Sequence, residues 1–180
     1  MKTIVTGGAG FIGSHVSELL IAQGHEVVVV DNLTSGRLEN LKSVASHPRF
    51  KFANTDIRDL SCLQPLFEGA DWVFHFAGLA DIVPSIEMPG QYYSTNVSGT
   101  FNVLECARRC GVKRFLYAAS SSSYGIPDIY PTPESGHLGE FRVLLGDKIL
   151  DANRKISTTT QEVVLSSGAI TVETPRKEGL

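Results

Sequence analysis

The sequence predicts an α/β protein with a doubly wound parallel sheet, and three observations carry this prediction. Five short apolar runs alternate with helical patterns along residues 1–119, an order typical of strands that helices join into a parallel sheet. The first run leads into glycines at positions 7, 10 and 13. Polar residues follow the later runs, at the sheet edge where open α/β folds bind ligands.

The chain opens with a strand, a tight turn and a helix. Ile4 and Val5 mark the strand, and the helix has apolar residues at helical spacing, at Phe11, Ile12, Val16, Leu19 and Leu20. The three glycines let phosphate oxygens approach the main chain because no Cβ is in the way. The first amides of the helix then face an anion, which the helix dipole also favours. We therefore expect the turn to bind a pyrophosphate.

An acidic residue ends the second strand. Val27–Val30 is predicted to be a strand buried on both faces, and Asp31 stands at its carboxyl end, 18 residues after Gly13. A carboxylate there accepts hydrogen bonds from both ribose hydroxyls of an adenine nucleotide and repels a 2′-phosphate. The spacing therefore favours NAD over NADP, although the nearby Arg37 argues the other way.

The remaining elements follow in order after a polar turn. We expect a short helix at 38–41, strands at 50–53, 72–76 and 115–119, and helices at 60–67 and 84–110. Gly69 and Gly111 end the two longer helices. The carboxyl ends of all five strands then lie at one edge of the sheet.

Several polar residues stand at that edge. Asp56 is expected to contact an adenine or to cap a helix N-terminus, and the two roles are compatible. His75 is expected to be a hydrogen-bonded strand-end histidine rather than a catalyst, and Asn96, within an apolar helix, needs a partner for its amide. Ser120 to Ser123 end the fifth strand, so we favour a functional role for their hydroxyls over a serine-rich turn.

Composition narrows the class of protein. The chain has 180 residues, 42% hydrophobic and 19% charged, as in a globular domain. A net charge of −3 offers no general attraction to nucleic acid or an anionic membrane, and no apolar run approaches the about 18 residues of a membrane span. Three cysteines argue against a disulfide scaffold, and Cys106 and Cys110 are expected to pack rather than hold a metal. We expect a cytoplasmic protein without nucleic-acid or membrane partners.

The motifs together resemble the extended short-chain dehydrogenase/reductase family. Within it they are most similar to the nucleotide-sugar epimerases and dehydratases of the UDP-glucose 4-epimerase type. The stretches that carry the resemblance are Thr6–His15, Asp31–Leu33, Asp56–Ile57, His75–Gly78, Ser85 with Pro89, Asn96–Thr100 and Ala119–Gly125. It covers residues 1–134 and implies an NAD-binding Rossmann domain there, with an atypical segment at 135–180 in place of the substrate domain.

The resemblance also implies roles for individual residues. The residues implied at the pyrophosphate are Gly7, Gly10, Phe11, Ile12 and Gly13, and those at the adenosine are Asp31, Asn32, Asp56 and Ile57. Phe76, Ala77 and Gly78 are implied to lie beside the cofactor, with Gly78 in place of the usual second alanine. Asn96 is implied to support the active-site helix, and Ser120 matches the family's catalytic Ser/Thr.

One family feature is absent from these 180 residues. The family has a Tyr-x-x-x-Lys pair whose tyrosine acts as general base, whereas the last tyrosine here is Tyr130 and Glu134 stands four positions on. Residues 135–180 do not resemble the family, although 162–165 and 169–173 fit a β-hairpin with a glycine turn.

Two functional hypotheses follow. By resemblance the chain is an NAD-dependent 4-epimerase (an isomerase) of a nucleotide-sugar such as a UDP-hexose, with impaired catalysis. Family members often form homodimers, and the sequence leaves the oligomeric state of this chain open. A dehydratase is less favoured, because Ser121 and Ser122 occupy the places of its acid pair. The alternative is a protein that binds NAD or NADH without turnover. We expect coenzyme binding with at most residual epimerase activity; the sequence does not identify the sugar.

Overall fold

The computed structural model describes residues 1–118, 129–130, 142–145, 148–151, 162–166 and 169–173. The chain divides into two compact units, Met1–Phe115 and Leu116–Leu180. The first unit contains every described residue that is expected at the coenzyme.

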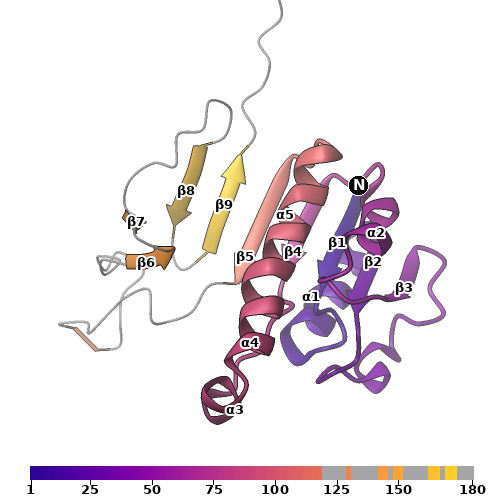
Figure 1. Ribbon diagram of the computed structural model, residues 1–180. Coiled ribbons are helices and arrows are strands. Elements are labelled where there is room, and N and C mark those ends of the chain that lie inside the picture. The colour runs from indigo at the N-terminus through magenta and orange to yellow at the C-terminus, as the bar shows by residue number, and fades with distance from the viewer. Residues whose placement is uncertain (119–128, 131–141, 146–147, 152–161, 167–168, 174–180) are drawn as a thin grey trace, which may run out of the picture. The chain divides into compact units, whose positions relative to one another are not determined.

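A parallel sheet with helices forms the first unit (Figure 1). Its strands are β1 (Lys2–Thr6), β2 (Glu26–Asp31), β3 (Phe50–Asn54), β4 (Trp72–His75) and β5 (Arg114–Ala118), which begins at the end of the unit. They lie in the order β3-β2-β1-β4-β5, and β1 pairs in parallel with both β2 and β4. The chain thus crosses from one side of β1 to the other after β3, which makes a topological switch point. The predicted doubly wound sheet is confirmed.

Helical segments connect these strands. They are α1 (Phe11–Ala22), the 3₁₀-helix η1 (Leu38–Leu41), α2 (Leu60–Leu63), the 3₁₀-helix η2 (Gln64–Phe67), α3 (Ile82–Glu87), α4 (Pro89–Tyr92), the π-helical η3 (Tyr93–Gly99) and α5 (Thr100–Arg109). The single long helix predicted at 84–110 is wrong. The chain leaves the helical region at Met88, with φ −128° and ψ 54°, because a following proline disfavours that region.

The core lies around β2. Val27 to Val30 are each at most 2% exposed, so the strand is buried on both faces as expected. One cluster joins β1, α1, β2 and η1 through Val5, Ala9, Leu20, Ile21, Val27, Val29, Leu41 and Val44. The apolar pattern of α1 only partly predicts burial, since Phe11, Ile12 and Leu19 are exposed.

Besides the end of β5 and residues 129–130, the described parts of the second unit are two antiparallel strand pairs. One joins β6 (Arg142–Leu145) to β7 (Lys148–Asp151), and the other joins β8 (Glu162–Ser166) to β9 (Ala169–Glu173). The second pair confirms the strand pairing predicted for 162–165 and 169–173. Ser120 to Ser123, Glu134 and the boundary predicted near 135 lie outside the described residues. In the described part of the chain, no helix has the length and apolar character that a bilayer crossing requires.

Candidate functional site

A pocket opens at the carboxyl ends of the first unit's strands. It encloses about 650 Å³, part of which is open solvent. Eight residues expected at the cofactor line it: Gly7, Gly10, Asp31, Asn32, Ile57, Phe76, Ala77 and Gly78. Nine further lining residues were not predicted from the sequence: Val30, Thr34, Ser35, Gly36, Thr55, Arg58, Leu79, Gln91 and Thr95. Within the described chain, Phe11, Ile12, Gly13, Asp56 and Asn96 are not among the lining residues.

The turn after β1 is closed by main-chain contacts. Gly7 has a φ of +67°, and a Cβ there would lie 2.6 Å from the backbone nitrogen of Ala77. A Cβ on Gly13 would lie 2.4 Å from the carbonyl oxygen of Gly7. The turn therefore requires glycine at both positions. Gly10 caps α1 without a side-chain hydrogen bond, and the amides of the first turn have no partner within the helix. These donors fit a pyrophosphate.

The loop after β2 fixes the Asp31 carboxylate. Its Oδ2 accepts a hydrogen bond from the amide of Ala9 at 3.0 Å, and its Oδ1 accepts one from the amide of Leu33 at 2.8 Å. A Cβ on Gly36 would lie 2.7 Å from Oδ1, so Gly36 leaves room beside the carboxylate. Each oxygen has a further lone pair. The arrangement therefore fits the two hydroxyls of a ribose, and the glycine in the polar turn was the signal for this neighbour.

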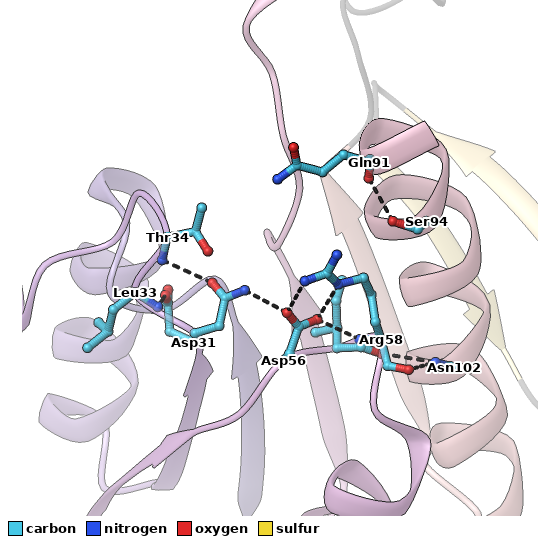
Figure 2. Close-up of polar contacts among 10 residues, drawn as sticks. Asp31, Leu33, Thr34, Asp56, Arg58, Gln91, Ser94 and Asn102 are labelled. Carbon is cyan, nitrogen blue, oxygen red and sulfur yellow. Dashed lines mark hydrogen bonds and ion pairs between the residues drawn. The ribbon is translucent and has the colours of Figure 1, made fainter. Parts of the chain in front are cut away.

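Asp56 is held by several donors at once. Its Oδ1 accepts hydrogen bonds from Arg58 N and Nε, both at 2.9 Å, and its Oδ2 accepts from Arg58 Nη2 at 2.7 Å and Asn32 Nδ2 at 2.9 Å. Figure 2 shows the Arg58 side chain folded back onto the carboxylate. The hydrogen bond from the Arg58 side chain, above all, holds the pKa of Asp56 far below its ordinary value. Asp56 is therefore ionised at neutral pH.

The helix-cap role considered for Asp56 is wrong. Asp59 is the N-cap of α2, and its side chain accepts hydrogen bonds from the amides of Ser61 and Cys62. The two aspartates stand three positions apart in one polar turn, and only the second directly precedes the helix. An adenine contact by Asp56 stays a prediction.

The segment after β4 forms the opposite wall of the pocket. Its Leu79 is held by Asn96, whose Oδ1 accepts from the Leu79 amide and whose Nδ2 donates to the Leu79 carbonyl, both at 2.8 Å. Asn96 lies in the π-helical η3, a distortion that is common at functional sites. The amide of Asn96 thus has the partner that its apolar surroundings require.

His75 connects three elements behind this wall. Its ring is fully buried, with Nδ1 2.5 Å from Thr6 Oγ1 and Nε2 2.9 Å from Thr100 Oγ1. The Thr6 hydroxyl also accepts a long 3.4 Å hydrogen bond from the amide of Ala77 in the wall. Burial lowers the pKa of His75 to about 4, so the ring is neutral at pH 7. This is the hydrogen-bonded strand-end histidine that was expected.

The cysteines show no sign of a metal site. Cys106 is buried, and burial raises the pKa of its thiol to about 11. The Cys110 sulfur accepts a hydrogen bond from Gln64 Nε2 at 3.1 Å. Among the residues that the structure describes, no group of three or more His, Cys, Asp or Glu side chains could hold a metal ion.

The sequence of this chain matches a known protein family and is similar to individual members of it. The model of the NAD dependent epimerase/dehydratase family matches residues 3–142. The chain is 40% identical over 143 residues to a UDP-glucose 4-epimerase of Yersinia enterocolitica, covering 77% of this chain and 43% of that protein. It is 40% identical over 135 residues to UDP-glucuronic acid decarboxylase 1 of Arabidopsis thaliana, covering 75% of this chain and 30% of the relative.

Solved structures of epimerases also match this chain. A crystal structure of UDP-galactose 4-epimerase matches with a TM-score of 0.65 and 44% identity, over 77% of this chain and 44% of that one. The UDP-glucose 4-epimerase of Bifidobacterium longum, in complex with NAD⁺ and UDP, matches with a TM-score of 0.69 and 32% identity, over 79% and 44%. The chain spans less than half the length of each of these relatives.

Proposed function

The chain belongs to the NAD-dependent epimerase/dehydratase family, and from that premise we propose that it binds NAD in the pocket at the carboxyl edge of its sheet. The observation that carries the proposal is the pairing of a glycine turn, which requires its glycines, with the fixed Asp31 carboxylate. The first amides of α1 bind the pyrophosphate, and Asp31 accepts hydrogen bonds from the adenosine ribose. The wall at Phe76 to Leu79 lies beside the coenzyme.

We further propose an epimerase-like role toward a nucleotide-sugar of the UDP-hexose class. NAD⁺, when bound, would supply hydride transfer from C4 of the hexose and back, and the proton of the C4 hydroxyl would pass to a base or to solvent. Ser120 donates a hydrogen bond to the reacting hydroxyl and so orients it. Since the 180 residues contain no Tyr-x-x-x-Lys pair, a general base is missing, and loss of such a base typically costs about 10²–10⁴ in rate. Turnover is therefore at most residual.

A protein that binds NAD(H) without turnover is the second candidate, and the missing pair of residues favours it. We also propose a cytoplasmic location, in keeping with the three unpaired cysteines.

We propose in addition that the chain forms a homodimer. Exposed apolar side chains on η3 and α5 support this: Tyr93, Val97 and Phe101 are 56%, 47% and 63% exposed.

A fluorescence titration with NADH and NADPH, beside an assay on UDP-glucose, tests the proposal. We expect NADH to bind, NADPH to bind more weakly, and epimerisation to be slow or absent. Asp31→Asn should weaken NADH about tenfold or more, since a hydrogen bond to a charged group contributes about 1.5–3 kcal/mol, and it should narrow the gap to NADPH. Asp71→Asn, whose ion pair is with Lys113, is the control.

The two parts of the proposal fail separately. If NADH does not bind to the wild-type chain, the coenzyme site is wrong. If the chain turns over UDP-glucose as fast as ordinary epimerases do, the proposal that a general base is missing is wrong, while the proposed coenzyme site stands.

A further inference from the structure

Arg58 lines the pocket beside Ile57 and Asn32, whereas Asp56, which was predicted to contact the adenine, is not among its described lining residues. Both oxygens of Asp56 already accept two hydrogen bonds each, three from Arg58 and one from Asn32. A carboxylate has about four acceptor positions. A new ligand group can therefore reach Asp56 only by displacing one of these donors.

The ion pair also fixes the orientation of the Arg58 guanidinium. Two of its nitrogens, Nε and Nη2, donate from one edge of the planar group to the two oxygens of Asp56, at 2.9 and 2.7 Å. Figure 2 shows this edge-on contact, with the guanidinium lying next to the Asp56 carboxylate. The flat faces are not used by these bonds, and the Arg58 side chain is 43% exposed.

We propose that Arg58 stacks a face of its guanidinium on the adenine ring of NAD, and that Asp56 and Asn32 are positioning residues that hold this face in place. The inference rests on the proposed coenzyme site. Asp31, which is proposed to hold the adenosine ribose, lines the same pocket as Ile57 and Arg58, so the base attached to that ribose is placed within reach of Arg58. A guanidinium is planar and weakly hydrated, and it stacks readily on aromatic faces.

Stacking and hydrogen bonding to the base make different demands on the ligand. A hydrogen bond from the adenine amino group to Asp56 requires that amino group. Stacking on Arg58 requires only a flat purine, because every base has a π-face. A coenzyme in which hypoxanthine replaces adenine keeps the flat purine and loses the amino group.

The experiment measures dissociation constants of three ligands for the full chain. They are NADH, reduced nicotinamide hypoxanthine dinucleotide, and reduced nicotinamide mononucleotide. The mononucleotide has no purine, and its binding is measured by how well it displaces NADH. The variants are Arg58→Ala and Arg58→Lys. Arg108→Ala is the matched control, since Arg108 forms the same kind of two-point pair with Glu105, both contacts at 2.8 Å, outside the pocket lining.

We expect Arg58→Ala to weaken both dinucleotides by the same factor, about tenfold, as base stacking contributes roughly that much. Arg58→Lys should recover little of it, because an ammonium has the charge without the plane. Arg58→Ala should leave the dissociation constant of the mononucleotide unchanged. Arg108→Ala should leave the dissociation constants of all three ligands unchanged.

An unchanged dissociation constant for NADH in Arg58→Ala, or full recovery in Arg58→Lys, would overturn the stacking role. So would an Arg58→Ala loss that is confined to the adenine coenzyme, since it would indicate hydrogen bonding to the amino group. If the wild-type chain binds no NADH, the proposed function itself has failed.

Discussion

Gly7 shows how one residue constrains both the backbone and the pocket. Its φ of +67° strains any other residue, and a Cβ would meet backbone atoms of Phe76 and Ala77 within 2.8 Å. Backbone atoms cannot move aside as the end of a flexible side chain can. The same residue that permits the turn thus also permits contact between the turn and the β4 wall.

We therefore predict that Gly7→Ala lowers the free energy of unfolding by at least about 2 kcal/mol, from strain and displacement together, and abolishes NADH binding. Gly111→Ala is the matched control, because Gly111 also has a φ of +67° but nothing within 4 Å of its Cβ position. It should cost about 1 kcal/mol from strain alone and leave NADH binding intact. Urea denaturation and NADH titration measure both; equal losses in the two variants would contradict the argument.

His75 makes stability depend on pH. Its folded pKa of about 4 lies below the ordinary 6.5, so the unfolded chain binds the proton more readily. The contribution of the neutral His75 ring to the free energy of unfolding is complete above pH 6.5, and it is lost as the pH falls toward 4. One pKa unit corresponds to about 1.4 kcal/mol, so the loss reaches about 3 kcal/mol.

This prediction is checked by urea denaturation between pH 7 and pH 4.5. Asp56, Asp59 and Glu105, whose pKa values are lowered in the folded chain, begin to contribute only at the acid end of this window, where the unfolded carboxylates take up protons, and they contribute equally in a His75 variant. His75→Gln cannot titrate, so its free energy of unfolding should be nearly level there. A slope that is the same in both proteins would assign the pH dependence to other groups.

At the scale of the element, the π-helical segment η3 is the connection between the helix layer and the pocket wall. It places Asn96 opposite Leu79 so that one side-chain amide satisfies both main-chain groups of that residue. The wall has left the sheet by this point, since β4 ends at His75. Phe76, the first residue of the wall, still donates to the Thr6 carbonyl of β1 at 3.0 Å, whereas Leu79 depends on the Asn96 side chain for both main-chain partners.

We expect Asn96→Ala to destabilise the chain by about 2 kcal/mol, because it leaves the Leu79 amide and carbonyl without their partner, and to weaken NADH. Ser94→Ala removes a single bond from an exposed hydroxyl to the Gln91 carbonyl and should change either quantity little. Thermal unfolding and NADH titration distinguish them. If both variants bind NADH like the wild type, Asn96 does not position the wall.

At the scale of the whole molecule, the exposed apolar side chains of η3 and α5 bear on assembly. Tyr93, Val97, Phe101 and Leu104 recur at helical spacing and are each at least 36% exposed. Such a stripe is typical of an interaction surface.

For the proposed homodimer we predict that Phe101→Ser shifts the chain toward monomer in sedimentation velocity, by removing a large apolar contact. Lys42→Ser, on an exposed residue just after η1, should leave the sedimentation coefficient unchanged. A wild-type chain that sediments as a monomer at every concentration would rule out the dimer.

The sequence by itself determined the features that local main-chain chemistry controls. The glycines at 7, 10 and 13, the buried valines of β2 and the acid at its end each depend on residues close in the chain, so spacing was enough to predict the sheet and half of the pocket. The same glycines and acid predicted NAD from their spacing, and the family resemblance agreed with that prediction. The break at Met88 was also a local signal, present in the following Pro89, but the apolar pattern around it outweighed that signal.

Only the tertiary structure decided which side chains meet across the pocket. Arg58, Gln91 and Thr95 come from three separate loops and helices, and nothing in their local sequence marks them as members of one pocket. Asp56 shows both cases: the three hydrogen bonds from Arg58, two positions on, are local, whereas the one from Asn32, at the end of another strand, depends on the tertiary structure. Hydrogen bonds and close contacts between distant segments depend on how the strands are ordered, and periodicity along one chain does not contain that order.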